Sequence, residues 1–302
     1  MQIRTLALAL VPMGALLCAS ALLTGAGAAE PAPVPHGTPT TWGQHLVDEA
    51  LAAHPEVVVL AVHATPSKEK TNVIVASNIG RIGKKADPDD LHVIATGQPK
   101  LEVNKAGNRF EVEETLQNVS GKTIGAIGVV FAYTKGQDTS RDQKTAAEIQ
   151  RFFAKHVLSE ANLMDRYPYT DISPDNTAQA LVDKTMARHP ELLVLGMHVT
   201  LPDQRGNVFL GSNIGRIGKK ADADDMRVVN TGKSNFEVSD DGKRYEVELV
   251  LEDASGHNIG ALGTVFRYRS AADKPALNAL AIKIRNEMAR QIPAAASLAK
   301  AS

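Results

Sequence analysis

An eleven-residue segment, SNIGRIGKKAD, occurs twice in this chain, at positions 77–87 and 212–222. Matches continue without a gap on both sides at the same offset: His63 corresponds to His198 and Gly128 to Gly263, and 198 − 63 gives 135 residues. Solenoids are built from much shorter repeats, of about 20–45 residues. We therefore expect two copies of one domain, each with its own core, and a pair of related sites if the protein has a site.

The first residues have the pattern of a secretory signal peptide. Arg4 precedes a run without charged side chains up to residue 23, and the small residues 25–29 then provide an Ala-x-Ala cleavage pattern at 26–28. An uncleaved membrane anchor is the alternative, since the run is nearly long enough to span a bilayer. We expect cleavage, a periplasmic or secreted product, and no membrane span after cleavage.

Composition excludes several kinds of chemistry. Cys18, inside the expected signal peptide, is the only cysteine, so the exported product has no disulfide, thiolate nucleophile or cysteine-bound metal. The formal net charge of −1 becomes about −2 without Arg4, which gives no reason to expect nucleic acid or an anionic membrane as a partner.

Each copy has the same succession of sequence signals. In the first copy, helical spacing over 42–53 stops at the dipeptide His54-Pro55. β-Branched runs then predict strands, a Gly-, Lys- and Asp-rich stretch predicts a loop with a short helix, and a helical pattern closes the copy. The predicted strands are 57–65, 72–77, 100–104, 109–116 and 124–133; the short helix lies within 79–92 and the closing helix is 145–163. In the second copy the corresponding helices are 177–189 and 277–291.

These patterns predict an α+β fold of two domains, each with an antiparallel sheet of about five strands flanked by helices. The expected segments are a signal peptide 1–28, an extended leader 29–40, a first domain 41–163, a linker 164–176, a second domain 177–292 and a tail 293–302.

Several motifs resemble the extracytoplasmic Cache domains, the PAS-like sensor modules of bacterial receptors. They are VIVASN at 73–78, IGK at 82–84 followed by Asp87, TG at 96–97 and NVSGKTIGAIGVVF at 118–131. The resemblance covers almost all of both copies. It implies a PAS-like fold and a pocket over the sheet for a small metabolite such as an amino acid, a carboxylate or an amine. Unlike the usual receptor, this chain has no kinase, cyclase or chemotaxis module after Tyr268.

Strand alternation places the candidate pocket. Side chains 58, 60, 62 and 64 form a continuous apolar face, as expected for a core covered by helices. The opposite face becomes small and polar at one end, where Ala61 or Gly196 lies beside a histidine and a threonine. Small residues at 126 and 128 and their counterparts leave room there for a ligand. The alternative is that His63 and His198 are hydrogen-bonded sheet histidines packed under a loop.

The repeated loop adds amide, guanidinium, ammonium and carboxylate groups. The alternative is that four of them form the solvated face of a short helix with Asp87 as its N-cap: Lys84, Lys85, Asp89 and Asp90. The candidate ligand-binding residues are His63, Thr65, Ser77, Asn78, Arg81, Lys84 and Asp87 in the first copy and His198, Thr200, Ser212, Asn213, Arg216, Lys219 and Asp222 in the second.

The common enzyme templates are absent from the sequence: there is no Gly-x-Ser-x-Gly elbow, His-Glu-x-x-His helix or phosphate-binding loop. Glu111 and Glu113 alternate with apolar residues and are interpreted as solvated charges. We therefore expect no catalytic residues, no metal site and no cofactor, with an enzyme that uses His63 as general base as a remote alternative.

The expected function is that of an exported, sensor-type protein that binds a small metabolite and has no signalling output of its own. An anionic metabolite is one candidate ligand, and a membrane receptor is a candidate partner. The alternative is an interaction module that docks on another extracytoplasmic protein and binds no ligand.

Overall fold

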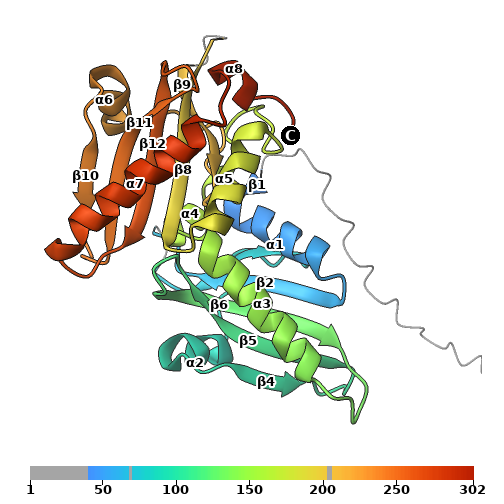
Figure 1. Cartoon of the computed structure of the whole chain (residues 1–302). Helices are drawn as coiled ribbons and strands as arrows, with labels where there is room; N and C mark the ends of the chain where they lie inside the picture. Colours follow the sequence, from blue (N-terminus) through green and yellow to red (C-terminus); the bar gives the residue numbers. More distant parts are fainter. Residues whose placement is uncertain (1–39, 68–69, 203–205) are drawn as a thin grey trace, which may run out of the picture. The chain divides into compact units, whose positions relative to one another are not determined.

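The computed structural model describes residues 40–67, 70–202 and 206–302 (Figure 1). The expected signal peptide and nearly all of the expected leader lie outside these residues. Both repeats belong to one compact unit of the chain.

The two repeats have the same order of helices and strands. The first contains β1 (Thr40–Thr41), α1 (Trp42–Ala53), β2 (Val57–Ala64), β3 (Val73–Ser77), α2 (Pro88–Thr96), β4 (Lys100–Val103), β5 (Arg109–Gln117), β6 (Thr123–Ala132), α3 (Ser140–His156) and α4 (Glu160–Leu163). After β7 (Arg166–Tyr167), the second contains α5 (Thr177–Arg188), β8 (Leu192–Leu201), β9 (Gly206–Ser212), α6 (Ala223–Thr231), β10 (Asn235–Val238), β11 (Arg244–Glu252), β12 (Asn258–Arg267), the 3₁₀ helix η1 (Ala271–Asp273), α7 (Lys274–Ala289) and α8 (Ala295–Leu298).

Each repeat has a five-stranded antiparallel sheet, in the order β3-β2-β6-β5-β4 in the first and β9-β8-β12-β11-β10 in the second. The predicted α+β class, with two such sheets flanked by helices, is confirmed, and the arrangement is consistent with two PAS-like domains. The domain boundaries expected from the sequence stay a prediction.

The apolar face predicted for the first strand is buried. Leu60 and Val62 are fully buried in the main core, as are Leu195 and Met197 in the second repeat. Helices α1 and α3 pack on the first sheet through β2, β3 and β5, whereas α2 contacts β5 and β6. The short helix α2 therefore covers the face of the sheet that carries His63, and α6 covers the corresponding face in the second repeat.

The short helices begin and end with clear capping signals. The side chain of Asp87, the residue before α2, accepts hydrogen bonds from the N–H groups of Asp89 and Asp90, and the Asp90 side chain accepts one from the Asp87 N–H. This reciprocal capping box satisfies amides that the first helical turn leaves free. Gly97, in the left-handed conformation, ends the helix. The prediction of Asp87 as an N-cap is confirmed.

The closing helix of the first repeat differs from the prediction. A single helix was expected over 145–163, whereas α3 begins five residues earlier and ends at His156, and α4 follows as a separate turn. Ser159 causes the restart, because its side chain caps α4 by accepting a hydrogen bond from the Asn162 N–H. The expected linker and tail also contain the short elements β7 and α8.

Among the residues that the structure describes, no helix is both long and apolar enough to cross a membrane.

One glycine in each repeat allows the two central strands to approach each other beside the candidate site. Gly125 pairs with Ala64, and Gly260 with Val199. A Cβ atom at Gly125 would collide with the carbonyl oxygen of His63, and one at Gly260 with that of His198. Glycine is therefore the residue that fits the backbone next to each histidine.

We predict that Gly260→Ala lowers the free energy of unfolding by about 1–3 kcal/mol, because β12 must move away from β8 to admit the methyl group. Urea unfolding measures this loss. Gly263→Ala is the control on the same strand, since its Cβ would lie 3.5 Å from the nearest atom, Oε1 of Glu246. Equal stability losses in the two variants would contradict the explanation.

Candidate binding site

A buried histidine lies near the end of the first strand of the sheet, along the chain, in each repeat. His63 on β2 is 7% exposed and His198 on β8 is 3% exposed. Small residues surround each one: Ala61 pairs with Gly128 across β2 and β6, and Gly196 pairs with Gly263 across β8 and β12. The absence of bulk on this face leaves space between the sheet and the short helix.

The short helix supplies a carboxylate to each histidine. Nδ1 of His63 lies 3.3 Å from Oδ2 of Asp90, and Nε2 of His198 lies 3.4 Å from Oδ1 of Asp225. The capping box holds these carboxylates in place, since Oδ2 of Asp225 accepts a hydrogen bond of 2.8 Å from the Asp222 N–H. Helix capping and site construction thus use the same residue.

A glutamate from the fourth strand of each sheet completes the cluster. Glu113 on β5 is 7% exposed and Glu248 on β11 is 3% exposed, so the interpretation of Glu113 as a solvated charge was wrong. The physical reason is that α2 covers this part of β5. Glu111 also differs from that interpretation, because burial raises its pKa, with a further rise from Asp90.

Burial shifts the proton affinities of the whole cluster. Desolvation, reinforced by Asp90, raises the pKa of Glu113 to about 8. Desolvation, followed by a hydrogen bond with Asp225 and its charge, raises the pKa of Glu248 to about 9. Desolvation also lowers the pKa of His63, and that of His198 to about 4. Both histidines are therefore neutral at pH 7, and the two glutamates tend to hold a proton.

Each cluster contains polar atoms that are buried without a partner. Within the described part of the chain, Nδ1 of His198 and Oε1 of Glu248 have no hydrogen-bond partner. Over the same residues, Oε2 of Glu113 has no hydrogen-bond partner, and Nδ1 of His63 makes no hydrogen bond although it lies 3.3 Å from Oδ2 of Asp90. Native proteins rarely leave such groups unsatisfied, because each costs about 1–3 kcal/mol. The same residue types are unsatisfied in both repeats.

A small cavity adjoins each cluster, with a volume of about 210 Å³ in the first repeat and about 160 Å³ in the second. Both volumes are smaller than those of drug-sized pockets, which have about 300–1,000 Å³. The first cavity is lined by Asp87, Asp89, Lys100, Glu102, Asn104, Glu111 and Glu113. Its single cation, Lys100, forms ion pairs with Asp89 and Glu102. This acidic lining does not suit the anionic metabolite considered from the sequence.

The second cavity brings together more of the predicted residues. His198, Ser212, Arg216, Lys219 and Asp222 line it, together with Asp225 and Glu246. In the first repeat, Asp87 is the predicted residue that lines the cavity, and Arg81 and Lys84 are exposed. The cluster of His63, Asp90 and Glu113 still forms there, so the acidic centre is duplicated although its rim is not.

Other predicted residues have structural partners. Asn78 accepts a hydrogen bond from the Leu60 N–H and donates one to the carbonyl of Val58, and Asn213 repeats both contacts with Leu195 and Leu193. These asparagines fix the loop to the sheet. Similarly, the hydroxyls of Ser77 and Ser212 accept hydrogen bonds from the N–H groups two residues later. Thr65 and Thr200 are exposed, and Thr200 accepts a hydrogen bond from Asn207.

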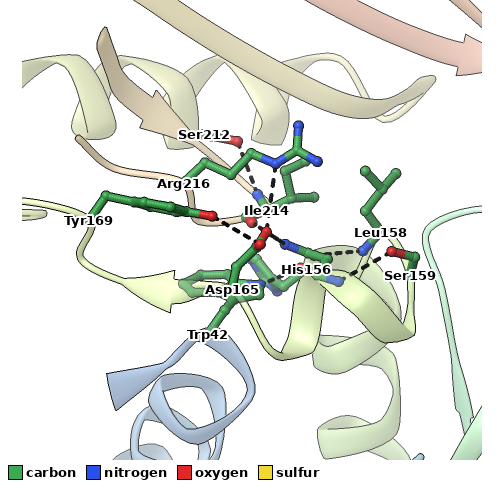
Figure 2. Close-up of polar contacts among 10 residues, drawn as sticks. Trp42, His156, Leu158, Ser159, Asp165, Tyr169, Ser212, Ile214 and Arg216 are labelled. Atoms are coloured by element: carbon green, nitrogen blue, oxygen red, sulfur yellow. Dashed lines mark hydrogen bonds and ion pairs between the residues drawn. The ribbon is translucent and has the colours of Figure 1, made fainter. Parts of the chain in front are cut away.

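The identical loops of the two repeats have different surroundings. Ile82 is 58% exposed, whereas its counterpart Ile217 is fully buried. The second loop packs on the first repeat: Asn162 donates a hydrogen bond to the carbonyl of Ile214, and Nε of Arg216 lies 3.9 Å from Oδ2 of Asp165. Figure 2 shows the side chains of Arg216 and Tyr169 converging on that carboxylate. Beside it, the indole N–H of Trp42 donates a hydrogen bond to the carbonyl of His156. Arg216 therefore lies between the second cavity and Asp165 in the segment that joins the two repeats.

One substitution between the repeats changes access to the histidine. Phe209 replaces Ile74, and its ring lies 3.6 Å from the imidazole of His198, centroid to centroid. Gly196 replaces Ala61 because a Cβ there would lie 2.9 Å from the Phe209 ring. The aromatic ring makes His198 more deeply buried than His63.

Sequence reasoning considered Asp90 as a solvated helix residue, which was wrong because Asp90 is 3% exposed, and it did not name Asp225. It also misread Glu113. A signal was nevertheless present, since the pairs Asp90/Asp225 and Glu113/Glu248 have the same offset of 135 residues as the histidines. What the sequence did not reveal is that a helix folds over the glutamate strand.

Comparisons with known proteins add little to this geometry. No protein-family model matches the sequence, and no curated protein matches it. Among solved structures, PelD from Pseudomonas aeruginosa PAO1 is similar at 14% identity, with 81% of this chain and 76% of that chain covered and a TM-score of 0.25. An RNA-binding light-oxygen-voltage receptor is similar at 11% identity, with 78% and 99% covered and a TM-score of 0.17. At these TM-scores neither likeness carries an argument.

We predict that, in the presence of EDTA, the free energy of unfolding of Glu248→Gln falls less steeply with rising pH than that of the wild type. The wild-type carboxyl holds a proton when folded and releases it on unfolding, so its contribution is complete below pH 4.5 and is lost as the pH rises to about 9. Glutamine has no proton to lose, although Glu246, whose pKa is also raised by burial, faces the same site. Urea unfolding across this window measures the slope.

Glu252→Gln, at the end of the same strand, is the control and should leave the slope unchanged. A slope that is the same in Glu248→Gln and wild type would show that the glutamate is ionised in the folded protein.

Proposed function

We propose that this chain is an exported, Cache-like binding protein without catalytic activity, and that its two repeats each bind a small ligand through a positively charged group. The observation that carries the proposal is that, among the residues that the structure describes, buried side-chain atoms of the same residue types make no hydrogen bond in either repeat. These atoms belong to His63 and Glu113 in the first repeat and to His198 and Glu248 in the second. A ligand that satisfies these atoms would remove their desolvation cost.

The sign of the ligand charge follows from the carboxyl groups. Asp90 and Glu113 meet at the first centre and Asp225 and Glu248 at the second. Like charges brought together in a buried site raise one another's pKa, and a cation reverses this effect. In the second repeat, Arg216 and Lys219 at the cavity could in addition contact a negative group of the same ligand.

The size of the ligand follows from the volumes. Cavities of about 210 and 160 Å³ accommodate a hydrated ion or a molecule of a few heavy atoms. Such a ligand matches the small metabolites implied by the resemblance to Cache domains. The signal-peptide pattern of residues 1–28 supports periplasmic or secreted localisation.

A thermal-shift comparison tests this function. We expect at least one of two small cationic probes, ethylammonium and Zn²⁺, to raise the Tm of the chain. Acetate should have no effect on the Tm. At about 100 times its Kd, a ligand adds about 2.7 kcal/mol to the free energy of unfolding. This corresponds to several degrees of Tm for a protein of this size.

The double variant Glu113→Gln/Glu248→Gln should lose the shift while keeping a cooperative unfolding transition. A shift produced by acetate, or a cation shift that survives in the double variant, would count against the proposal.

A second candidate function is the interaction module. It is favoured by the exposure of Ile82 in a loop whose identical counterpart is buried against the first repeat. Under this function none of the probes raises the Tm.

A further inference from the structure

We propose that His198, Asp225 and Glu248 bind a divalent first-row transition-metal ion, and that His63, Asp90 and Glu113 form an equivalent site in the first repeat. This inference rests on the proposed function and specifies the class of its ligand. It differs from the sequence-based expectation, which included no metal site.

The ligand atoms already converge. One donor atom from each of His198, Asp225 and Glu248 lies within 4.8 Å of the other two. Two ligands of one tetrahedral Zn²⁺ ion lie about 3.4 Å apart, since each bond is about 2.0–2.2 Å long. Side-chain rotations that bring the donor atoms closer by ~1.4 Å or less therefore close the site. In the first repeat the converging set is Asp87, Asp90 and Glu113, with His63 joining through its contact of 3.3 Å with Asp90.

The unpartnered atoms are independent evidence for a ligand. A cluster of acidic residues alone is common on protein surfaces, but His198 and Glu248 are each 3% exposed. In the region that the structure describes, Nδ1 of His198 and Oε1 of Glu248 are buried without a hydrogen bond. A metal ion would accept the lone pairs of both residues after a rotation of the imidazole, which presents either ring nitrogen.

The scaffold holds the ligands from three different elements. His198 comes from β8, Asp225 from the first turn of α6 and Glu248 from β11. The Asp222 N–H donates a hydrogen bond to Oδ2 of Asp225 and leaves its Oδ1 facing His198. Such a bond to the second carboxylate oxygen orients a ligand before the metal arrives.

The donor set determines the kind of metal. A bound metal ion displaces the proton of the glutamate into solvent, and one neutral imidazole and two carboxylates then have a combined charge of −2, which balances a divalent ion. Mg²⁺ and Ca²⁺ are usually bound by oxygen alone, whereas imidazole favours Zn²⁺ and neighbouring transition metals. The cavity of about 160 Å³ beside the cluster leaves room for water at the remaining coordination positions.

Isothermal titration of the EDTA-treated, dialysed full chain with Zn²⁺ tests the inference. We expect two ions to bind per chain, and one in Glu248→Gln or in Glu113→Gln. Glutamine keeps the shape of the side chain but removes its anionic oxygen, so the affinity of the altered site should fall at least ~10-fold. The double variant should bind neither ion.

Two controls exclude adventitious binding. Nδ1 of His257, an exposed residue, lies 3.3 Å from Oδ2 of Asp253, which makes this pair the obvious surface site for stray zinc. His257→Gln and Glu252→Gln should leave the stoichiometry and affinity of wild type. The inference is overturned if the double variant still binds two ions, or if His257→Gln removes the signal.

The outcomes also separate this inference from the function on which it rests. If Zn²⁺ produces no heat while ethylammonium raises the Tm of wild type but not of Glu113→Gln/Glu248→Gln, the metal inference fails and the proposed function stands. If neither probe binds, both fail.

Discussion

The burial of a histidine and two carboxyl groups between a sheet and one short helix constrains each repeat of this protein. The backbone is shaped to permit it: glycine opposes the histidine carbonyl, and a capping box directs Asp90 or Asp225 into the site. Burial of these groups is unfavourable in itself, as the raised pKa values of Glu113 and Glu248 indicate. The ligand that we propose would compensate for this cost in both repeats.

The two sites are equivalent at their centres and different at their rims. Phe209 covers His198, whereas Ile74 occupies the corresponding position near His63. Arg216 lies between the second cavity and Asp165 of the preceding segment, whereas Arg81 is exposed. The second site is therefore the more enclosed, and its loop is held by contacts with the first repeat. The first site remains the more open and the more acidic.

The sequence was sufficient to predict the architecture, because the 135-residue offset reveals the duplication and strand alternation is a local pattern. It also placed the N-cap at Asp87, since capping depends on neighbouring residues. It failed for Glu113, whose environment depends on a helix that folds back over β5. It also failed for Asn78 and Asn213, whose amides satisfy the backbone of a neighbouring strand rather than a ligand. Polar residue type alone does not distinguish a contact with a ligand from one within the fold.

Anomalous diffraction at the zinc absorption edge, from crystals of the chain grown with Zn²⁺, tests the central claim most directly. The account predicts one peak among His198, Asp225 and Glu248 and a second among His63, Asp90 and Glu113. A map without peaks at either cluster, or with zinc confined to His257 and Asp253 on the surface, would contradict it.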